Sequence, residues 1–233
     1  MTAATSPSPS ARADFWAGVR AELPILLGVT PFGMIYGVLA VKAGLPAAAA
    51  QAMSSIVFAG SSQFMAVQLI STATPAAVII LSILVINLRH ALYSASIAPY
   101  LHGLSRTWKA VLAYLLTDEA YAVAITLYQK KGVIPGSPWF LLGAGLALWT
   151  DWQLSTAVGI FLGAQIPAAW SLDFTLALTF IALVIPNLRD RPSALAALSA
   201  GVTAVLAHGL PYKLGLLLAA LVGILVGLWS ERR

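Results

Sequence analysis

The chain lacks cysteine and carries very little charge. With no cysteine among its 233 residues, disulfide bonds, thiolate metal sites and cysteine nucleophiles are all excluded. Charged residues make up 9% of the chain, against roughly 25% in a soluble domain. A soluble globule of this length could not cover a sequence that is 60% hydrophobic. The solvent around most of this chain is therefore lipid.

Signatures of enzymes and of nucleic-acid-binding proteins are missing too. The three histidines lie far apart, and no His, Asp and Glu residues have the spacing of a metal site. The sequence has no Gly-x-Ser-x-Gly motif and no phosphate-binding loop. Its 13 Lys and Arg residues are scattered singly or in pairs, without the basic stripe of a nucleic-acid surface. We expect no enzyme, no metal, no cofactor and no nucleic-acid partner.

Eight apolar segments approach the roughly 20 residues that a spanning helix needs. They are 23–43, 47–70, 76–98, 110–128, 139–162, 173–188, 193–208 and 213–229. The third is interrupted by charge and the seventh is short. The sequence therefore predicts an all-α polytopic membrane protein with seven or eight transmembrane helices. Residues 15–233 form one transmembrane domain, and the Pro/Ser-rich residues 1–14, which lack the apolar core of a signal peptide, form a disordered cytoplasmic tail.

The Lys and Arg residues predict the orientation, because cytoplasmic loops carry the excess of basic residues. With eight spans and the N-terminus inside, most of them lie in the cytoplasm: Arg12, Arg20, Lys130, Lys131, Arg189, Arg191, Arg232 and Arg233. Outside lie Lys42, Arg106, Lys109 and Lys213. Both termini are then cytoplasmic. If the seventh segment does not span, the C-terminus lies on the opposite side.

The tripeptide Asn-Leu-Arg occurs at 87–89 and again at 187–189, each time at the end of an apolar run. Phe58-Ala-Gly-Ser-Ser-Gln63 precedes the first copy and Phe161-Leu-Gly-Ala-Gln165 precedes the second. An offset of three spans reverses direction in the membrane, as in the inverted repeats of many secondary transporters. Either the chain holds three-helix inverted repeats at about 22–105 and 108–191 with a helical hairpin at about 192–230, or two apolar stretches resemble each other by chance.

Proline and glycine punctuate the first segment at Thr30-Pro31-Phe32-Gly33. Proline removes one backbone donor, and freed carbonyls are tolerated in a membrane where protein or a wet cavity satisfies them. The segment is therefore either a broken helix at a substrate site or a kinked helix. Glycines spaced four apart predict close helix packing: Gly33/Gly37, Gly159/Gly163 and Gly223/Gly227. The last pair could instead contact another subunit.

Polar residues interrupt the second and third segments. Ser61, Ser62 and Gln63 follow Gly60 in mid-segment, where they either line a polar path or bond neighbouring helices. Asn87, Arg89 and His90 lie within the third segment. The Arg89 guanidinium either reaches a lipid headgroup or lies in the membrane with a partner, and its fork geometry suits a carboxylate.

Three carboxyl groups lie inside predicted spans. Asp118 and Glu119 occupy the middle of the fourth segment, and Asp151 lies between two tryptophans of the fifth. Intramembrane carboxylates mark functional sites by default, and burial favours their protonated form, as a proton carrier requires. Each is either a proton-coupling group or part of a structural ion pair, with Arg89 as an obvious partner.

Together these motifs resemble the AzlC family, the large subunits of bacterial branched-chain amino acid exporters. The matching pieces are Thr30-Pro-Phe-Gly-Met-Ile-Tyr-Gly37, Phe58-Ala-Gly-Ser-Ser-Gln-Phe64, Asn87-Leu-Arg-His-Ala-Leu-Tyr93, Leu116-Thr-Asp-Glu-Ala-Tyr-Ala122 and Leu183-Val-Ile-Pro-Asn-Leu188. The resemblance implies proton-driven export of Leu, Ile and Val, with Met as a further candidate. It also implies a small AzlD-type membrane subunit and a place in the bacterial cytoplasmic (inner) membrane.

The leading hypothesis is a proton-coupled amino acid exporter that works by alternating access. In it Arg89 holds the substrate carboxylate, Asp118 carries the proton or meets the ammonium group, and Asp151 is the alternative carrier. The remaining residues expected to line the path are Pro31, Phe32, Gly33, Phe58, Gly60, Ser61, Ser62, Gln63, Asn87 and His90, with Phe32 or Phe58 against the branched side chain. The alternative is a channel or scaffold subunit whose partner carries the substrate site.

Overall fold

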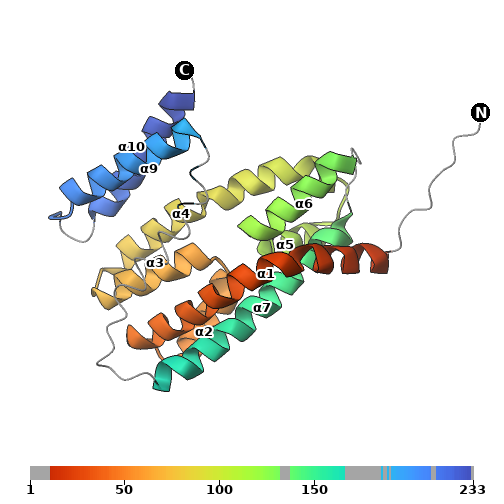
Figure 1. Cartoon of the computed structure of the whole chain (residues 1–233), viewed down its shortest axis with the longest axis horizontal. Coiled ribbons are helices and arrows are strands. Elements are labelled where there is room, and N and C mark those ends of the chain that lie inside the picture. The colour runs from red at the N-terminus through yellow and green to blue at the C-terminus, as the bar shows by residue number, and fades with distance from the viewer. Residues whose placement is uncertain are drawn as a thin grey trace, which may run out of the picture. The chain divides into compact units, whose positions relative to one another are not determined.

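The structure is a computed structural model, and it describes residues 11–131, 137–165, 185, 188, 190–210 and 214–231. The elements of these ranges are all helices (Figure 1), in agreement with the all-α prediction. Two compact units are present, the first made of Met1–Val41, Leu45–Gln63 and Asn87–Gln165, and the second of Lys42–Gly44, Phe64–Ile86 and Ile166–Arg233. The predicted segment 173–188 and the second Asn-Leu-Arg lie outside the described residues, apart from Ile185 and Leu188.

Helix α1 (Ala11–Lys42) is continuous over 32 residues and includes both Pro24 and Pro31. Of the two alternatives at Pro31 and Gly33, the broken helix is therefore contradicted. Proline removes one hydrogen bond locally. Here Pro31 lies on the exposed side of α1 and Gly33 is buried, so the helix continues past both residues. Helix α1 starts at Ala11, within the range 1–14 that was predicted to be a tail.

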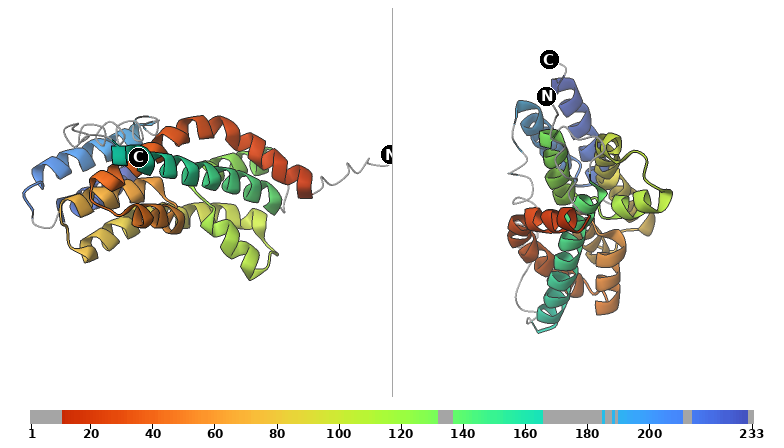
Figure 2. Two further views of the ribbon diagram at one scale, coloured as in Figure 1. Left: turned by 90° about the horizontal axis from the view of Figure 1, so that it is seen from below. Right: turned by 90° about the vertical axis from the view of Figure 1, so that its right-hand side faces the viewer.

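Glycines bring α1 and α7 (Pro138–Gln165) into backbone contact. A Cβ added to Gly18 would lie 2.0 Å from the carbonyl oxygen of Phe140, and one added to Gly159 would lie 2.0 Å from that of Met34. The start of α1 thus contacts the start of α7, and the end of α1 contacts the end of α7. The two helices therefore run parallel, and they lie side by side in both Figure 1 and Figure 2. Small residues allow this close approach, as the glycine spacing predicted.

Two predicted spans are each interrupted. The segment 47–70 forms α2 (Ala47–Val57) and α3 (Gly60–Ser71), separated by Phe58 in the left-handed conformation with φ of 41°. The segment 110–128 forms α5 (Arg106–Tyr114) and α6 (Asp118–Lys131). Thr117 caps α6, because its carbonyl accepts the Tyr121 N–H at 2.9 Å. Asp118 and Glu119 therefore begin a helix, which corrects their predicted place in the middle of one.

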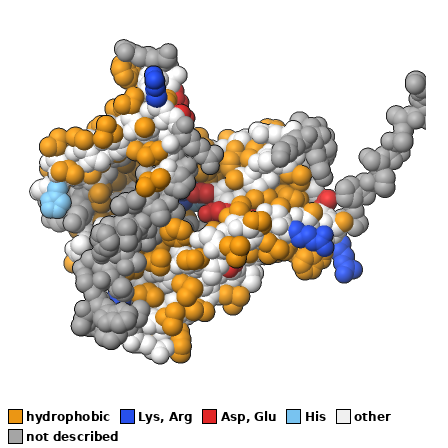
Figure 3. Space-filling model, in the orientation of Figure 1, with side chains coloured by type: hydrophobic (Ala, Val, Ile, Leu, Met, Phe, Trp, Pro, Cys, Tyr) orange, Lys and Arg blue, Asp and Glu red, His pale blue; other side chains and the backbone are white. Residues whose placement is uncertain are grey.

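The third segment is α4 (Ala76–Ile97), extended by the 3₁₀ turn η1 (Ala98–Leu101). Within the described ranges, three helices are long and apolar enough to cross a membrane: Ala11–Lys42, Ala76–Leu101 and Leu214–Glu231. Helix α7, with 28 residues, is long enough as well but is not one of these three. Hydrophobic side chains cover much of the face shown in Figure 3, as contact with lipid requires. The number of spans stays a prediction.

In the second unit, α9 (Arg191–Leu206) and α10 (Leu214–Glu231) form an antiparallel hairpin. Gly223 lies against Ala196 and Ala200 of α9, and Gly227 lies against Ala196. The glycines of α10 thus pack within the chain, and the alternative that they contact another subunit is not needed. Asp190 caps α9 by accepting the Ser193 N–H at 2.8 Å, and hydrogen bonds from Ser193 hold the pKa of Asp190 below its usual range.

The inverted repeat stays a prediction. Its second copy needs the segment 173–188, most of which lies outside the described residues. The described part offers one observation: the interruption at Phe58 in the second segment has no counterpart in α7, the fifth.

Candidate functional site

The site is built where α3 and α6 begin inside the first unit. The first turn of a helix leaves backbone N–H groups without intrahelical partners, and it forms the positive end of the helix dipole. In α3 this turn holds Ser61 and Ser62, and the first intrahelical bond joins the Gln63 N–H to the Ala59 carbonyl at 2.9 Å. In α6 it holds Asp118 and Glu119, two carboxylates placed where the dipole stabilises them.

Arg89 of α4 joins the two helix starts. Its Nη1 donates to Asp118 Oδ2 at 2.6 Å, and its Nη2 donates to Ser61 Oγ at 2.6 Å. The side chains of Arg89 and Asp118 are 30% and 38% exposed, so the pair is neither sealed in the interior nor spread on the surface. Of the two alternatives for Arg89, the geometry thus favours a guanidinium that is bound by protein groups over one that extends to a lipid headgroup.

The ion pair leaves hydrogen-bonding capacity unused. The Nε of Arg89 and Oδ1 of Asp118 are buried, and neither has a hydrogen-bond partner among the described residues. A bidentate Arg–carboxylate pair would engage two donors and both oxygens. With the single bond here, the Nε donor of the cation and the Oδ1 acceptor of the anion can bind a further polar group.

The other polar residues of α3 hold its start against its neighbours. Ser62, which is fully buried, donates to Asn87 Oδ1 at 2.6 Å. Gln63, also fully buried, accepts from Trp152 Nε1 of α7 at 3.0 Å. A Cβ on Gly60 would lie 3.0 Å from the same indole ring. Ser61 faces the ion pair, whereas Ser62 and Gln63 fix the position of α3 relative to α4 and α7.

Several predicted site residues lie elsewhere in the first unit. Asp151 Oδ1 accepts from the Thr30 hydroxyl at 2.7 Å, and its other oxygen has no partner in the described part of the chain. Gly33 packs on Ser155 of α7, next to exposed Pro31 and half-buried Phe32. These residues belong to the α1–α7 contact, and no described contact joins them to Arg89.

Phe58 and His90 lie on the chain beside the site. Phe58 is buried, with its ring 5.9 Å from that of Tyr114. His90 follows Arg89 on α4, with its ring 6.0 Å from that of Tyr93. Tyr93 in turn stacks on Tyr121 of α6 at 4.5 Å. These aromatic contacts hold the second half of α4 against α6, the helix that carries Asp118.

Glu22 is a buried acid that the sequence analysis did not identify. Its side chain has no exposed surface, and neither carboxyl oxygen has a hydrogen-bond partner within the described ranges. Glu119 is the charged group that acts on it. The predicted first segment started at residue 23, so Glu22 fell just outside it. The spacing of four from Gly18, which faces α7, is the signal that could have placed Glu22 on the buried side.

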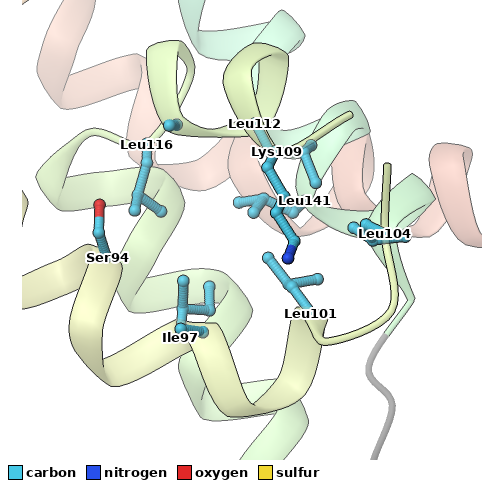
Figure 4. A pocket seen from close by; sticks show the side chains of 10 residues that line it. Ser94, Ile97, Leu101, Leu104, Lys109, Leu112, Leu116 and Leu141 are labelled. Carbon is cyan, nitrogen blue, oxygen red and sulfur yellow. The ribbon is translucent and has the colours of Figure 1, made fainter. Parts of the chain in front are cut away.

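An apolar cavity of about 210 Å³ lies between the end of α4, α5 and α7 (Figure 4). Its wall includes Ile97, Leu101, Leu112, Leu116 and Leu141, with Ser94 and Lys109 as the polar contributors. Leu116 precedes Asp118 by two residues, and Ser94 follows Arg89 by five. Such a wall accepts an aliphatic group and provides little for a polar one.

The first unit combines long apolar helices with two interrupted segments. A charged pair lies where the second helix of each interrupted segment begins. This is the arrangement of secondary transporters, whose substrate sites lie at discontinuous helices. The chain is accordingly a helical membrane protein with an Arg–Asp pair at the starts of two helices.

Comparison with known proteins identifies the family. Residues 24–166 match the AzlC protein family, and the chain belongs to it. The chain is 32% identical over 228 residues to an uncharacterized membrane protein of Archaeoglobus fulgidus, covering 96% of this chain and 98% of the relative. It is 24% identical to the inner membrane protein YgaZ of Escherichia coli, covering 96% and 95%.

A third relative carries a substrate in its name. The chain is 27% identical over 207 residues to the branched-chain amino acid transport protein AzlC of Bacillus subtilis, covering 85% of this chain and 80% of the relative. No solved structure matches this chain.

Proposed function

We propose that this chain is the large subunit of a proton-coupled exporter of branched-chain amino acids. The observation that carries the proposal is the Arg89–Asp118 pair with its unused donor and acceptor. An amino acid is a zwitterion, so its carboxylate and ammonium groups complement a guanidinium and a carboxylate that lie side by side. Arg89 then holds the substrate carboxylate, and Asp118 meets the ammonium group.

In this proposal, substrate binding replaces the bond between Arg89 and Asp118. The ammonium group takes the place of Arg89 at Asp118 while the guanidinium turns to the substrate carboxylate, so each charge stays paired throughout. Ser61, which accepts from Arg89 at 2.6 Å, keeps the guanidinium at the start of α3. The positive end of α3 adds to the attraction for a carboxylate.

The apolar cavity provides for the branched side chain. Phe32 or Phe58 was the expectation from sequence, but Phe58 packs on Tyr114 and Phe32 lies on α1. The cavity lined by Leu101, Leu112 and Leu116 is the better candidate because its wall is aliphatic. Its position next to Asp118 along the chain supports this assignment.

Export, proton coupling and a small AzlD-type subunit complete the proposal. The name of the Bacillus subtilis relative supports the substrate class. The names of the relatives as membrane or inner membrane proteins support the bacterial inner membrane as the location. The interrupted helices α2/α3 and α5/α6 support alternating access, because half-helices surround the site in such transporters.

The test is transport of labelled leucine in vesicles that contain the chain, with and without a candidate small subunit, against an imposed pH gradient. We expect saturable, gradient-dependent uptake that is lost in Arg89→Ala. Arg106→Ala, at the exposed start of α5, is the matched control and should retain transport. Uptake that never saturates would indicate the channel alternative. No transport and no leucine binding by either preparation would contradict the proposal.

A further inference from the structure

The buried face of α1 carries one carboxyl group. The buried residues of this helix are Gly18, Glu22, Gly33, Tyr36, Gly37, Leu39 and Ala40, a set of small and aromatic or aliphatic residues apart from Glu22. Gly18 and Gly33 both contact α7, so Glu22 lies on the stripe between two points where the helices touch. The side chain has no exposed surface at all.

A carboxylate in this environment cannot keep its charge. Neither oxygen of Glu22 accepts a hydrogen bond from any described residue, and an ionised group without a partner is strongly disfavoured away from water. The charge that acts on it electrostatically is that of another acid, Glu119 of α6. A fully buried carboxyl group without a hydrogen-bond partner favours its neutral form, and a second acid opposes its ionisation, so Glu22 retains a proton.

The other charged groups around Glu22 do not neutralise it. On α6, Asp118 precedes Glu119 and is paired with Arg89. On α7, the residues level with Glu22 lie between the contacts of Gly18 and Gly33, and the ionisable one among them, Asp151, is bonded to Thr30. On α1 itself, Arg20 is exposed.

We propose that Glu22, buried where α1 packs on α7, is the proton-binding site of this transporter. The proposal rests on the proposed function and adds to it a residue on a different helix from the substrate pair. A proton binds a carboxylate oxygen of Glu22 to form the neutral acid, and it leaves from the same oxygen when the site opens to water. No bond other than this O–H bond forms or breaks.

Glu119 connects the proton site to the substrate site. It is the neighbour of Asp118, and both Asp118 and Arg89 act on it electrostatically. A negative charge that appears on Glu22 is opposed by Glu119 and is favoured by any movement that brings Arg89 closer. Release of the proton is therefore linked to the release of Arg89 from Asp118, and so to substrate binding.

A proton fits this site better than a metal ion does. A metal cation needs several oxygen ligands that converge on one point. Within the described helices, no group of three or more His, Cys, Asp or Glu residues could hold one. A fully buried carboxyl group whose oxygens accept no hydrogen bond from any described residue fits a single proton instead.

The first experiment separates proton coupling from substrate movement. Glu22→Gln keeps the size and removes the titrating group, and Glu231→Gln makes the same change at an exposed position. We expect Glu22→Gln to lose leucine accumulation driven by a pH gradient, while exchange of internal for external leucine at equal pH continues. Glu231→Gln should keep both activities. Equal gradient-driven accumulation in the two variants would overturn the proposal.

The second experiment does not depend on leucine transport. Infrared spectra of the purified protein at neutral pH should contain the carbonyl stretch of a protonated carboxylic acid, absent in Glu22→Gln and present in Glu231→Gln. If wild-type protein moves no amino acid but the band disappears in Glu22→Gln, the proton site stands and the proposed function fails. An unchanged band in Glu22→Gln overturns the site.

A third variant guards against failure of Glu22→Gln to fold. Glu22→Leu replaces an unpartnered polar group by an apolar one of similar volume, and such replacements are neutral or stabilising in buried positions. Its melting temperature should equal or exceed that of the wild type, and it should lack both the acid band and gradient-driven accumulation. Retention of either would contradict the proposal.

Discussion

Arg89 shows how much a single side chain can organise in an apolar protein. A guanidinium in lipid needs a partner, and Arg89 has two, on different helices and both at 2.6 Å. It holds together helix starts that lie 57 positions apart in the sequence, at Ser61 and Asp118. The same contacts that position α3 and α6 are those that substrate would have to displace.

Removing one partner of this pair should destabilise the protein more than removing both. Arg89→Ala leaves Asp118 unpaired, and Asp118→Ala leaves Arg89 unpaired. Because both side chains are about one-third exposed, we expect each to cost about 1–2 kcal/mol, below the range for a sealed pair. Arg89→Ala/Asp118→Ala should recover part of that loss.

Thermal unfolding in detergent measures these free energies, and leucine transport measures function in the same variants. The double variant should be more stable than either single one and still fail to transport. Additive losses of stability would show that the two side chains act independently and would contradict the pairing.

At the scale of the helices, the glycine contacts between α1 and α7 decide how closely they approach. A Cβ on Gly37 would lie 2.4 Å from the Thr156 carbonyl oxygen and 2.6 Å from the Ile160 nitrogen. Both are backbone atoms, which cannot turn aside as a side chain can. The contact therefore depends on glycine at this position.

Gly37→Ala should destabilise the chain by about 1–3 kcal/mol, the usual range for overpacking. Gly28→Ala, on the same helix, meets nothing within 4 Å and should stabilise it by about 0.5–1 kcal/mol, because alanine is the better helix former. Unfolding midpoints in one detergent compare the two. Equal effects would show that α1 and α7 are not in backbone contact.

The helices also show what the sequence could and could not predict. Hydropathy identified most of the helical segments, and the need of Arg89 for a carboxylate pointed toward Asp118. The breaks at Phe58 and before Asp118 were missed because apolar residues continue across them. Thr117 followed by two acids is an N-cap signal that the long apolar run concealed. Pro31 of α1 was given too much weight as a sign of a broken helix. A helix breaks where a hydrogen bond is lost and capping groups also satisfy the freed backbone.

Burial of Glu22 could not be derived from sequence in the same way. It results from contacts with α7 and from the approach of α6, which join residues more than 90 positions apart. Periodicity shows which residues share a face of a helix, but the choice of the face that becomes buried depends on the packing of the other helices.

At the scale of the whole molecule, the parallel contact of α1 and α7 predicts sidedness. Their first residues, Ala11 and Pro138, must lie on one side of the membrane, and their last, Lys42 and Gln165, on the other. Parallel helices need an odd number of crossings between them, which agrees with three spans from residues 47 to 131.

Because the chain has no cysteine, single cysteines can be introduced directly. Asp14→Cys and Ser137→Cys should react with an impermeant thiol reagent from the cytoplasmic side of cells, and Lys42→Cys and Gln165→Cys from the outer side. Labelling of intact and opened cells measures this. Reaction of Lys42→Cys and Gln165→Cys from opposite sides would contradict the parallel packing.

Backbone contact along α1 and α7 also limits how the protein can change shape. Each of these glycines lies against particular backbone atoms of the opposite helix. If one helix slid along the other by a single residue, side chains would clash with backbone carbonyl groups. In the proposed transport cycle we therefore expect the two helices to move as a rigid body. The short segments at Phe58–Ala59 and Leu115–Thr117, where helices are interrupted, are the places where we expect motion, and they adjoin Ser61 and Asp118 of the proposed substrate site.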